Sequence, residues 1–399
     1  MITLRGITWD HPRGLQPLVA TAALFEAQHP DVHIDWEVRS LHAFGAQPID
    51  VLAQTYDLLV IDHPFVGVAA KTGCLLNCSH YLSELQLVQL EAESVGPSHR
   101  SYRYHGQQWA LAIDAAAQVS AYRPDLFAER GWKVPATWDE VVELATSEVG
   151  SVALPLTPVN AISCFLTLCA HYGEPPMRHY TQFVERAQGE TVLYLLSRLG
   201  ELVHPCSFVR DPPGMLDALS SSEIPIAYVP LIFGYSNYAR QGFRAHLCHF
   251  VDMPVRTAGI APQGSLLGGA GIAVSAACAT PDVAMEYTSW LASTPCQRAV
   301  YVQEGGQPAN HLAWTDPAVN ALTHSFFANT LATLELAYLR PRYPSYPAFQ
   351  DQAGTLLWQY LSHGGSLVAT LDALDTLYRE SIRDIDIDKE WREMEVARE

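Results

Sequence analysis

The sequence predicts an α/β protein built from two lobes. Strands and helices alternate at the start of the chain, which is the order typical of a doubly wound sheet. One expected strand, 58–61, is apolar at every position, as a parallel strand covered by helices on both faces should be. The chain has 399 residues, which is long for a single hydrophobic core. We therefore expect two lobes, each containing a doubly wound sheet.

The first strand begins at Ile2 and ends in a cluster of polar and aromatic residues. Pro12 and Gly14 prevent this strand from continuing, and an amphipathic helix is expected over 17–28. A strand with alternating apolar and polar residues follows at 32–38. These segments form the first strand–helix–strand unit.

The next predicted strand, 56–62, ends in an Asp-His-Pro sequence, and the first strand is followed by the same three residue types. Ligands in open α/β sheets bind at the carboxyl ends of strands. We therefore expect the two strand ends to lie side by side at the mouth of a cleft.

Later elements are predicted from periodicity and capping residues. Thr137 and Glu140 form a capping box at the start of a helix. Further strands are expected over 107–114, 118–122, 224–229 and 268–275. Further helices are expected over 161–171, 191–202, 316–339, 346–362 and 367–383, which makes the C-terminal third helical.

Composition excludes several classes of partner. The net charge of −18 argues against nucleic acid or an anionic membrane surface, and no apolar run is long enough to span a bilayer. The eight cysteines are scattered without a Cys-x-x-Cys pair, so free thiols in a reducing compartment are expected. A Cys74–Cys78 disulfide remains an alternative in an oxidising compartment. The first strand follows Met1 almost directly, so the sequence as it stands predicts a cytoplasmic protein, and a periplasmic one if a leader was removed.

The stretch YHGQQWALAIDAAAQVSAYRPDLF, followed by GWKVPATWDEV, closely resembles the family 1 extracellular solute-binding proteins of ABC importers, the maltose-binding-protein type. Two Thr-Pro helix starts, at Thr280 and Thr294, and a Gly-Gly-x-Pro turn ending at Pro308 follow in the family's order. Ile113 stands where the family usually has proline. The resemblance extends to about Arg383 and depends on the whole ordered series of motifs.

This resemblance implies a type II periplasmic-binding-protein-like fold, in which a hinge joins two lobes. It implies a first lobe of 1–113 and 258–308, a second lobe of 114–257 and 309–383, and a charged tail at 384–399. It also implies a small-molecule ligand held between the lobes, an ABC permease as partner, no cofactor and a monomeric protein.

Candidate ligand-binding residues gather at strand ends, lobe crossings and one helix start: Trp9, Asp10, His11, Arg13, Asp62, His63, Asp114, Asn160, Phe233, Tyr235 and Arg342. The carboxylates and imidazoles at the two strand ends could bind a polar ligand by charge-assisted hydrogen bonds, or a divalent metal. Equally, the aspartates could cap helices while the histidines bind backbone carbonyls. Strand-end spacing is not a diagnostic metal-ligand pattern, so no metal site is assigned.

The other candidates have comparable alternatives. The aromatic residues could stack on a sugar ring, as the family's aromatics do, or could pack between the lobes. Arg13 and Arg342 could bind a carboxylate or phosphate, or could form surface ion pairs. Asp114 lies at the first lobe crossing, and Asn160 lies near a helix start whose free N–H groups would face the cleft.

These observations predict a non-catalytic receptor for a carbohydrate or an organic acid. Two other classes remain open: an enzyme on the same fold, similar to thiamine-cleaving or thiamine-precursor enzymes, and a cytoplasmic ligand sensor. The Gly-rich sequence 268–271 precedes a strand rather than a helix, so it is not interpreted as a dinucleotide-binding loop.

Overall fold

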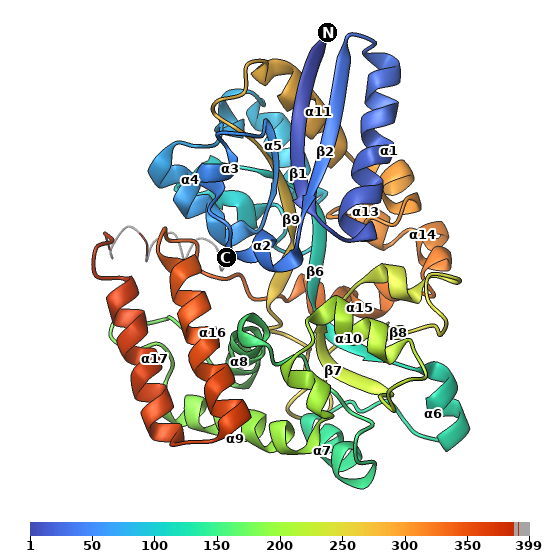
Figure 1. The fold of residues 1–399 in the computed structure, drawn as a ribbon, viewed down its shortest axis with the longest axis vertical. Helices are drawn as coiled ribbons and strands as arrows, with labels where there is room; N and C mark the ends of the chain where they lie inside the picture. Colours follow the sequence, from blue (N-terminus) through green and yellow to red (C-terminus); the bar gives the residue numbers. More distant parts are fainter. Residues whose placement is uncertain (387–389, 391–399) are drawn as a thin grey trace.

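The computed structural model describes residues 1–386 and residue 390. Figure 1 shows two groups of helices and strands stacked along the long axis, with strands β6 and β9 running between them. None of the described helices combines the length and apolar character needed to cross a bilayer. The predicted charged tail, 384–399, lies mostly outside the described residues.

The first lobe is built on parallel strands. Strand β1 pairs in parallel with β2 on one side and β3 on the other, and β3 pairs antiparallel with β9. Its elements are β1 (Ile2–Trp9), α1 (Pro12–Gln28), β2 (Val32–Arg39), α2 (Leu41–Ala46), α3 (Ile49–Leu52), β3 (Leu58–Ile61), α4 (Val66–Thr72), α5 (Glu84–Ala92), β4 (Arg103–Tyr104), β5 (Gln107–Gln108), β9 (Leu267–Val274), α11 (Pro281–Ala292) and α12 (Thr294–Cys296). The prediction of an inner apolar strand is confirmed, because every residue of β3 is buried. Helix α1 begins at Pro12, before the predicted start at residue 17, because His11 already caps it.

Strand β6 (Leu111–Tyr122) is one continuous strand where the sequence predicted two. Its first half pairs with β9, and its second half pairs with β7 and β8. The register shifts between Ala112 and Asp114, which marks a bulge that includes the buried Ile113. Strand β6 therefore carries the chain from the first lobe into the second.

The second lobe surrounds strands β7 (Tyr228–Phe233) and β8 (His249–Val251). Strand β7 begins later than the predicted strand at 224–229, and the N–H of Ala227, just before it, binds the carbonyl of Ser151. The helices of this lobe are α6 (Pro124–Arg130), α7 (Trp138–Ser147), α8 (Pro158–Tyr172), α9 (Arg186–Leu202), α10 (Pro212–Leu219), α15 (Phe326–Glu335), α16 (Tyr346–His363) and α17 (Leu367–Ser381). The predicted capping box of Thr137 and Glu140 is present at the start of α7.

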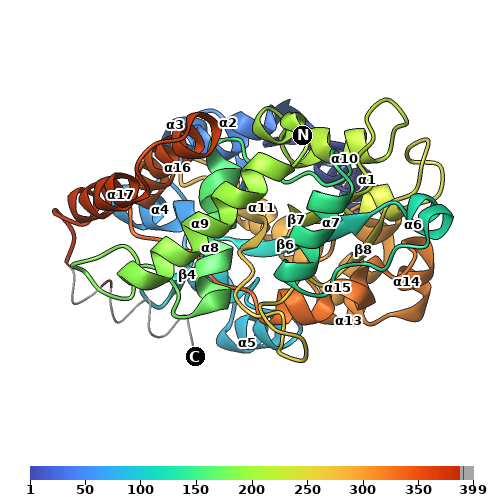
Figure 2. The ribbon, with the colours of Figure 1, turned by 90° about the horizontal axis from the view of Figure 1, so that it is seen from below.

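The C-terminal third is helical, as predicted, and its last two helices lie side by side against the second lobe (Figure 2). The helix predicted over 316–339 is divided into α14 (Pro317–Leu322) and α15, with α13 (His311–Trp314) before them. His324 and Ser325 separate α14 from α15, since both have positive φ angles, of 47° and 63°. The segment after α15 leads through Tyr338, which pairs with Leu266, to α16.

All eight cysteines are free thiols. Seven of them are buried, and burial raises the pKa of Cys78 and Cys164 to about 12. Buried thiols of this kind are unreactive at neutral pH.

Candidate functional site

A large cavity lies between the two lobes. Its volume is about 1050 Å³, and its walls come from the ends of β1, β3 and β7, the start of α8, the Gly-rich start of β9, and α16. The carboxyl ends of the parallel strands β1 and β3 therefore border this cavity, as the topology predicts. We call this cavity the interlobe cleft.

Arg13 and Asp114 form a buried ion pair on the wall of the cleft. The Nε of Arg13 donates to Asp114 Oδ2 at 2.8 Å, and a second guanidinium N–H donates to Asp114 Oδ1. The third guanidinium nitrogen of Arg13 donates to the carbonyl of Gly234 at 2.8 Å. Burial alone would lower the pKa of Arg13, but the adjacent carboxylate keeps this pKa above its ordinary value. Because Gly234 directly follows β7, Arg13 joins α1 of the first lobe to the second lobe.

Asp62 and Arg340 form a second pair in the cleft. Asp62 caps the short 3₁₀ turn His63–Phe65 through the N–H of His63, at 2.9 Å. One nitrogen of Arg340 donates to both Asp62 oxygens, at 2.7 and 2.8 Å, and another donates to Gln350 of α16 at 3.0 Å. Burial would raise the pKa of Asp62, but the charge of Arg340 and the hydrogen bonds from its neighbours lower this pKa to about 2. Asp62 is therefore ionised at neutral pH and is held by Arg340, which lies in the segment between α15 and α16.

Aromatic rings line the cleft from both lobes. Trp9 lies against Phe44, with ring centroids 5.3 Å apart, and its indole N–H is buried without a hydrogen-bond partner in the structure. A Cβ atom on Gly14 would approach the Trp9 ring to 2.5 Å, so only glycine allows this ring to occupy its position. From the second lobe, Phe233 lies over Gly268 in the same way, and Tyr235 stacks on Arg13 at 4.5 Å.

The start of helix α8 supplies uncharged polar groups. Asn160 is buried, and its amide donates to the Thr157 hydroxyl at 2.7 Å. Both residues line the cleft, together with Ser163 one turn further along the helix. The first N–H groups of a helix carry a partial positive charge and attract electron-rich ligand atoms.

Four of the predicted residues do not line the cleft. Asp10 is exposed to solvent. His11 is buried, accepts a hydrogen bond from the N–H of Arg13 at 3.0 Å, and packs against Tyr235 at 4.8 Å. His63 is buried behind Asp62, at 3.2 Å from Asp62 Oδ1.

The fourth, Arg342, is turned away from the cleft. Its guanidinium donates to the carbonyls of Arg100 and Ser101, at 2.8 and 3.4 Å, and to that of Arg103. It therefore holds the 100–103 turn instead of facing a ligand. Arg340, two residues earlier, contributes its side chain to the cleft.

Sequence reasoning missed several other cleft residues, and Arg340 is the most important of them. The sequence around 339–346 contains both arginines, but nothing in it distinguishes the one that faces the cleft. Phe44 and Gln350 were missed because helices α2 and α16 have no pattern that marks the cleft side. The Gly-rich stretch 268–271 was a usable signal, since Gly268 provides the space for Phe233.

The charges in the cleft are nearly balanced. Three arginines and four aspartates line it: Arg13, Arg210, Arg340, Asp62, Asp114, Asp211 and Asp351. The buried arginines, Arg13 and Arg340, are both paired with a carboxylate, whereas Asp211 and Asp351 are exposed. Within the described part of the chain, no group of three or more His, Cys, Asp or Glu side chains is placed to hold a metal ion.

Comparison with known proteins agrees with this geometry. The family model described as bacterial extracellular solute-binding protein matches residues 8–156. A probable amino-acid ABC transporter periplasmic-binding protein from Sinorhizobium fredii is 28% identical over 197 residues, which is 46% of this chain and 42% of that protein. The matched segment is thus less than half of the relative's length.

Solved structures resemble the whole chain. An ABC transporter solute-binding protein from Agrobacterium radiobacter, in complex with ribitol, has a TM-score of 0.79 at 22% identity and covers 95% of this chain and 98% of its own. One from Thermotoga lettingae, bound with α-D-tagatose, has a TM-score of 0.80 at 15% identity, with 96% and 100% covered. One from Agrobacterium vitis, with bound D-mannitol, has a TM-score of 0.73 at 14% identity, with 96% and 99% covered. These structures have the two-lobed type II periplasmic-binding fold, and the predicted resemblance of this chain to the bacterial extracellular solute-binding proteins is confirmed.

Proposed function

We propose that this chain captures a small polar solute in the interlobe cleft by hinge closure and presents it to an ABC permease. The observation that carries this proposal is a cleft of about 1050 Å³ whose walls come from both lobes and combine aromatic rings with fixed polar groups. Small-molecule sites have this composition, in which apolar walls give affinity and a few placed polar groups give orientation.

The charge balance of the cleft favours a neutral polyhydroxylated solute over an organic acid. Each buried arginine already shares its charge with an aspartate, so neither is free to neutralise a ligand carboxylate. Ionised carboxylates such as Asp62 accept hydrogen bonds from hydroxyl groups, and aromatic faces stack against sugar rings. Three of the similar solved structures hold ribitol, α-D-tagatose or D-mannitol, which are sugars or sugar alcohols.

We propose distinct roles for the residues on the cleft wall. Trp9, Phe233 and Tyr235 would stack on the solute, while Asp62 and Asn160 would hydrogen-bond its hydroxyl groups. Arg13 and Asp114 would act as an ion pair on this wall. His11 and His63 would support the wall from behind, through their contacts with Arg13 and Asp62. Asp10 and Arg342 are left out of the proposed site because neither lines the cleft.

A receptor without catalysis is the function that this cleft supports. No cysteine is among the described residues that line it, and the two cysteines nearest in sequence to Asn160, Cys164 and Cys169, have pKa values raised by burial. A thiol nucleophile of the kind used by thiamine-cleaving enzymes therefore has no counterpart on the cleft wall.

We further propose a monomer that acts outside the cytoplasmic membrane, where a permease can collect the solute. The Sinorhizobium fredii relative is named as a periplasmic-binding protein, which supports this location. We keep lobe limits of 1–113 with 258–308 and 114–257 with 309–383 as a proposal, with the crossings made within β6 and near the start of β9.

A thermal-shift screen of the purified full chain tests the proposal. Ribitol, D-mannitol, tagatose and maltose would be compared with citrate, succinate and thiamine. We expect saturable stabilisation by at least one neutral polyol or sugar, and a loss of affinity of about tenfold (about 1.4 kcal/mol) in Trp9→Ala. Stabilisation by organic acids alone would overturn the solute class. Product formed from any stabilising compound would overturn the receptor role.

A further inference from the structure

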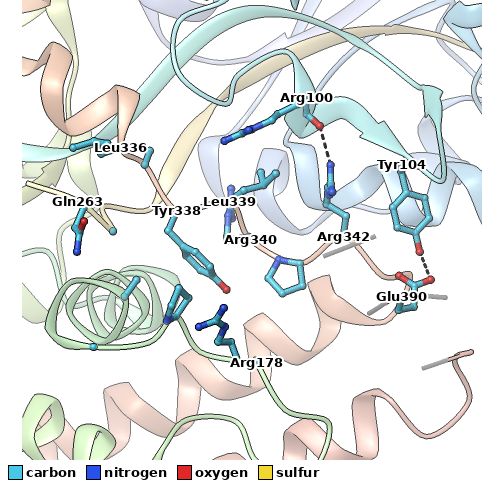
Figure 3. Close-up of a pocket in the computed structure, with 16 residues that line it drawn as sticks. Arg100, Tyr104, Arg178, Gln263, Leu336, Tyr338, Leu339, Arg340, Arg342 and Glu390 are labelled. Carbon is cyan, nitrogen blue, oxygen red and sulfur yellow. Dashed lines mark hydrogen bonds between the residues drawn. The ribbon is translucent and has the colours of Figure 1, made fainter. Parts of the chain in front are cut away.

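A second, smaller cavity lies beside the segment between α15 and α16, and its volume is about 350 Å³ (Figure 3). Arg342 on its wall is bound to the protein, since it donates to the carbonyl of Arg100. Arg100 and Arg178 lie at opposite ends of this cavity, so among the described residues no set of free donors converges there. The polar groups that do converge lie next to the interlobe cleft, around Gln307.

Gln307 is the third residue of the Gly-Gly-x-Pro turn, 305–308. Its side chain is fully buried. The amide nitrogen donates to the carbonyl of Ala115 in β6 at 2.7 Å, and to that of Gly234 after β7 at 3.1 Å. The amide oxygen accepts from the N–H of Ser236 at 2.9 Å. One side chain therefore joins β6 to the turn that follows β7.

These bonds take the place of strand pairing where β7 leaves β6. The N–H of Gly234 donates to the carbonyl of Ala117 at 3.2 Å, as in an antiparallel ladder. Ser236 then begins the short 3₁₀ turn Ser236–Ala239, and the first N–H groups of a helical turn have no partner within it. The side chain of Gln307 satisfies one of these N–H groups, so it caps the turn.

Asn237 joins the same two turns a second time. Its amide donates to the carbonyl of Gly305 at 3.1 Å. Gly305 has a φ angle of 92°, and a Cβ atom there would approach the Asn237 amide nitrogen to 2.8 Å, so this position requires glycine. The 305–308 turn is thus placed close enough for Gln307 to reach the backbone after β7.

Tyr235 lies between the two backbone groups that Gln307 binds. It lines the interlobe cleft, and the Arg13 guanidinium lies 4.5 Å from the centroid of its ring. Arg13 also donates to the carbonyl of Gly234 at 2.8 Å. A carbonyl oxygen has two lone pairs, and here Arg13 and Gln307 each occupy one. The place of the Tyr235 ring against Arg13 is therefore held by Gln307.

We propose that Gln307 is a positioning residue for the solute site: it holds the backbone on both sides of Tyr235 and so sets the place of the ring that the second lobe presents to the solute. Gln307 itself does not line the cleft. A glutamine amide donates to two carbonyls and accepts from an N–H at once, whereas an ionised glutamate lacks the donors and methionine lacks both functions. That Tyr235 contacts a solute rests on the proposed function, but its positioning by Gln307 can be measured without any solute.

Amide hydrogen exchange on the ligand-free full chain, followed residue by residue with NMR, tests the positioning. In Gln307→Met the N–H of Ser236 loses its acceptor and should exchange about tenfold faster. Gln307→Glu keeps an acceptor oxygen for this N–H, so we expect a smaller increase. If Gln307→Met does not fold, Gln307→Asn replaces it, because its shorter side chain cannot reach all three partners. The N–H of Ala115 is the internal control, because it binds the backbone carbonyl of Gln307, at 3.0 Å, which every variant keeps.

The matched control is Gln108→Met. Gln108 is also a buried glutamine, and its amide donates to the carbonyls of His99 and Ala110, at 3.1 and 2.8 Å. This substitution should lower stability without changing exchange at Ser236. The proposal is wrong if Ser236 keeps its native exchange rate in the Met or Asn variant of Gln307, or if Gln108→Met accelerates that exchange equally.

A double-mutant cycle on solute affinity separates positioning from a general loss of stability. Gln307→Met should weaken binding of the solute found in the screen by about fivefold, but by less than about twofold in a Tyr235→Ala background, where the positioned ring is already absent. Equal losses in the two backgrounds would show that Gln307 does not act through Tyr235. If no compound in the screen binds, the proposed function fails, and the exchange rates still decide whether Gln307 positions Tyr235.

Discussion

The two strand ends that border the interlobe cleft carry the same three residue types but use them differently. After β1, His11 caps helix α1 by accepting from the N–H of Arg13, at 3.0 Å. After β3, Asp62 is the cap and accepts from the N–H of His63, at 2.9 Å. Each of these Asp-His-Pro motifs is one copy, the first after β1 and the second after β3. The helical turn therefore starts one position later within the first copy than within the second. As a result Asp10 is exposed to solvent, whereas Asp62 lies on the cleft wall.

This difference shows that a helix start decides which residue of a short motif faces the cleft. In the first copy the charged group that reaches the cleft is Arg13, in the first turn of α1, and its partner Asp114 comes from β6. In the motif after β3 the charged group is the cap itself, and its partner Arg340 comes from the segment between α15 and α16. Both strand ends therefore bring a buried ion pair to the cleft. The group supplied by the strand end is positive after β1, where it is Arg13, and negative after β3, where it is Asp62.

The largest effect is expected from a substitution that breaks the first of these pairs, Arg13 with Asp114. Arg13→Met leaves Asp114 buried without its partner, and loss of one member of a buried pair costs about 3–5 kcal/mol. Urea unfolding followed by tryptophan fluorescence would measure the change in the free energy of unfolding. Asp10→Asn, at the same strand end but exposed, should change this free energy by less than about 0.5 kcal/mol. Equal effects of the two substitutions would contradict the assignment of Arg13 as the buried member.

The second prediction contrasts the two aspartates directly. Asp62→Ala should weaken binding of the solute found in the screen by about tenfold, because the cleft loses a carboxylate acceptor and Arg340 loses its partner. Asp10→Ala should leave the affinity unchanged. Calorimetry on both variants measures the contrast, and a similar loss in the two would mean that both strand ends face the ligand.

The sequence predicted the fold more completely than it predicted the site. Apolar periodicity and caps are local, so β3 and the α7 capping box could be read directly from the residues. The choice between Asp10 and Asp62 depends on where a helix starts, to within one residue, and no local pattern fixes that. The choice between Arg340 and Arg342 depends on contacts with residues more than two hundred positions away along the chain.

The third prediction uses the histidines, which are buried in both copies. Burial and the nearby arginines lower the pKa of His11 to about 3 and that of His63 to about 4. The unfolded chain takes up these protons near its ordinary value of 6.5, so lowering the pH below that value favours unfolding until the folded pKa is reached. As the pH falls from about 7.5 to about 5.5, each buried histidine should lower the free energy of unfolding by about 1 kcal/mol.

The variants His11→Gln and His63→Gln should each flatten this pH dependence, whatever they do to stability at neutral pH. His33→Gln serves as the control, because the His33 side chain is 55% exposed. Unfolding curves in urea at several pH values supply the comparison. An unchanged slope in both buried variants would show that neither imidazole resists protonation.

The smallest effect concerns the residue that ends β1 in the cleft. Trp9 lines the cleft, and its buried indole N–H has no hydrogen-bond partner among the described residues, so we expect a solute oxygen to become its acceptor when the cleft closes. Trp9→Phe keeps an aromatic ring over Gly14 but removes the donor, and should weaken binding two- to fivefold, or by about 0.5–1 kcal/mol. Trp138 also has a buried indole N–H without a partner, but it lies in the core of the second lobe, away from the cleft. Trp138→Phe should therefore alter stability and leave affinity unchanged, which separates loss of a ligand contact from loss of packing. Equal affinity in Trp9→Phe and the unmodified protein would mean that the β1 end contributes only its ring.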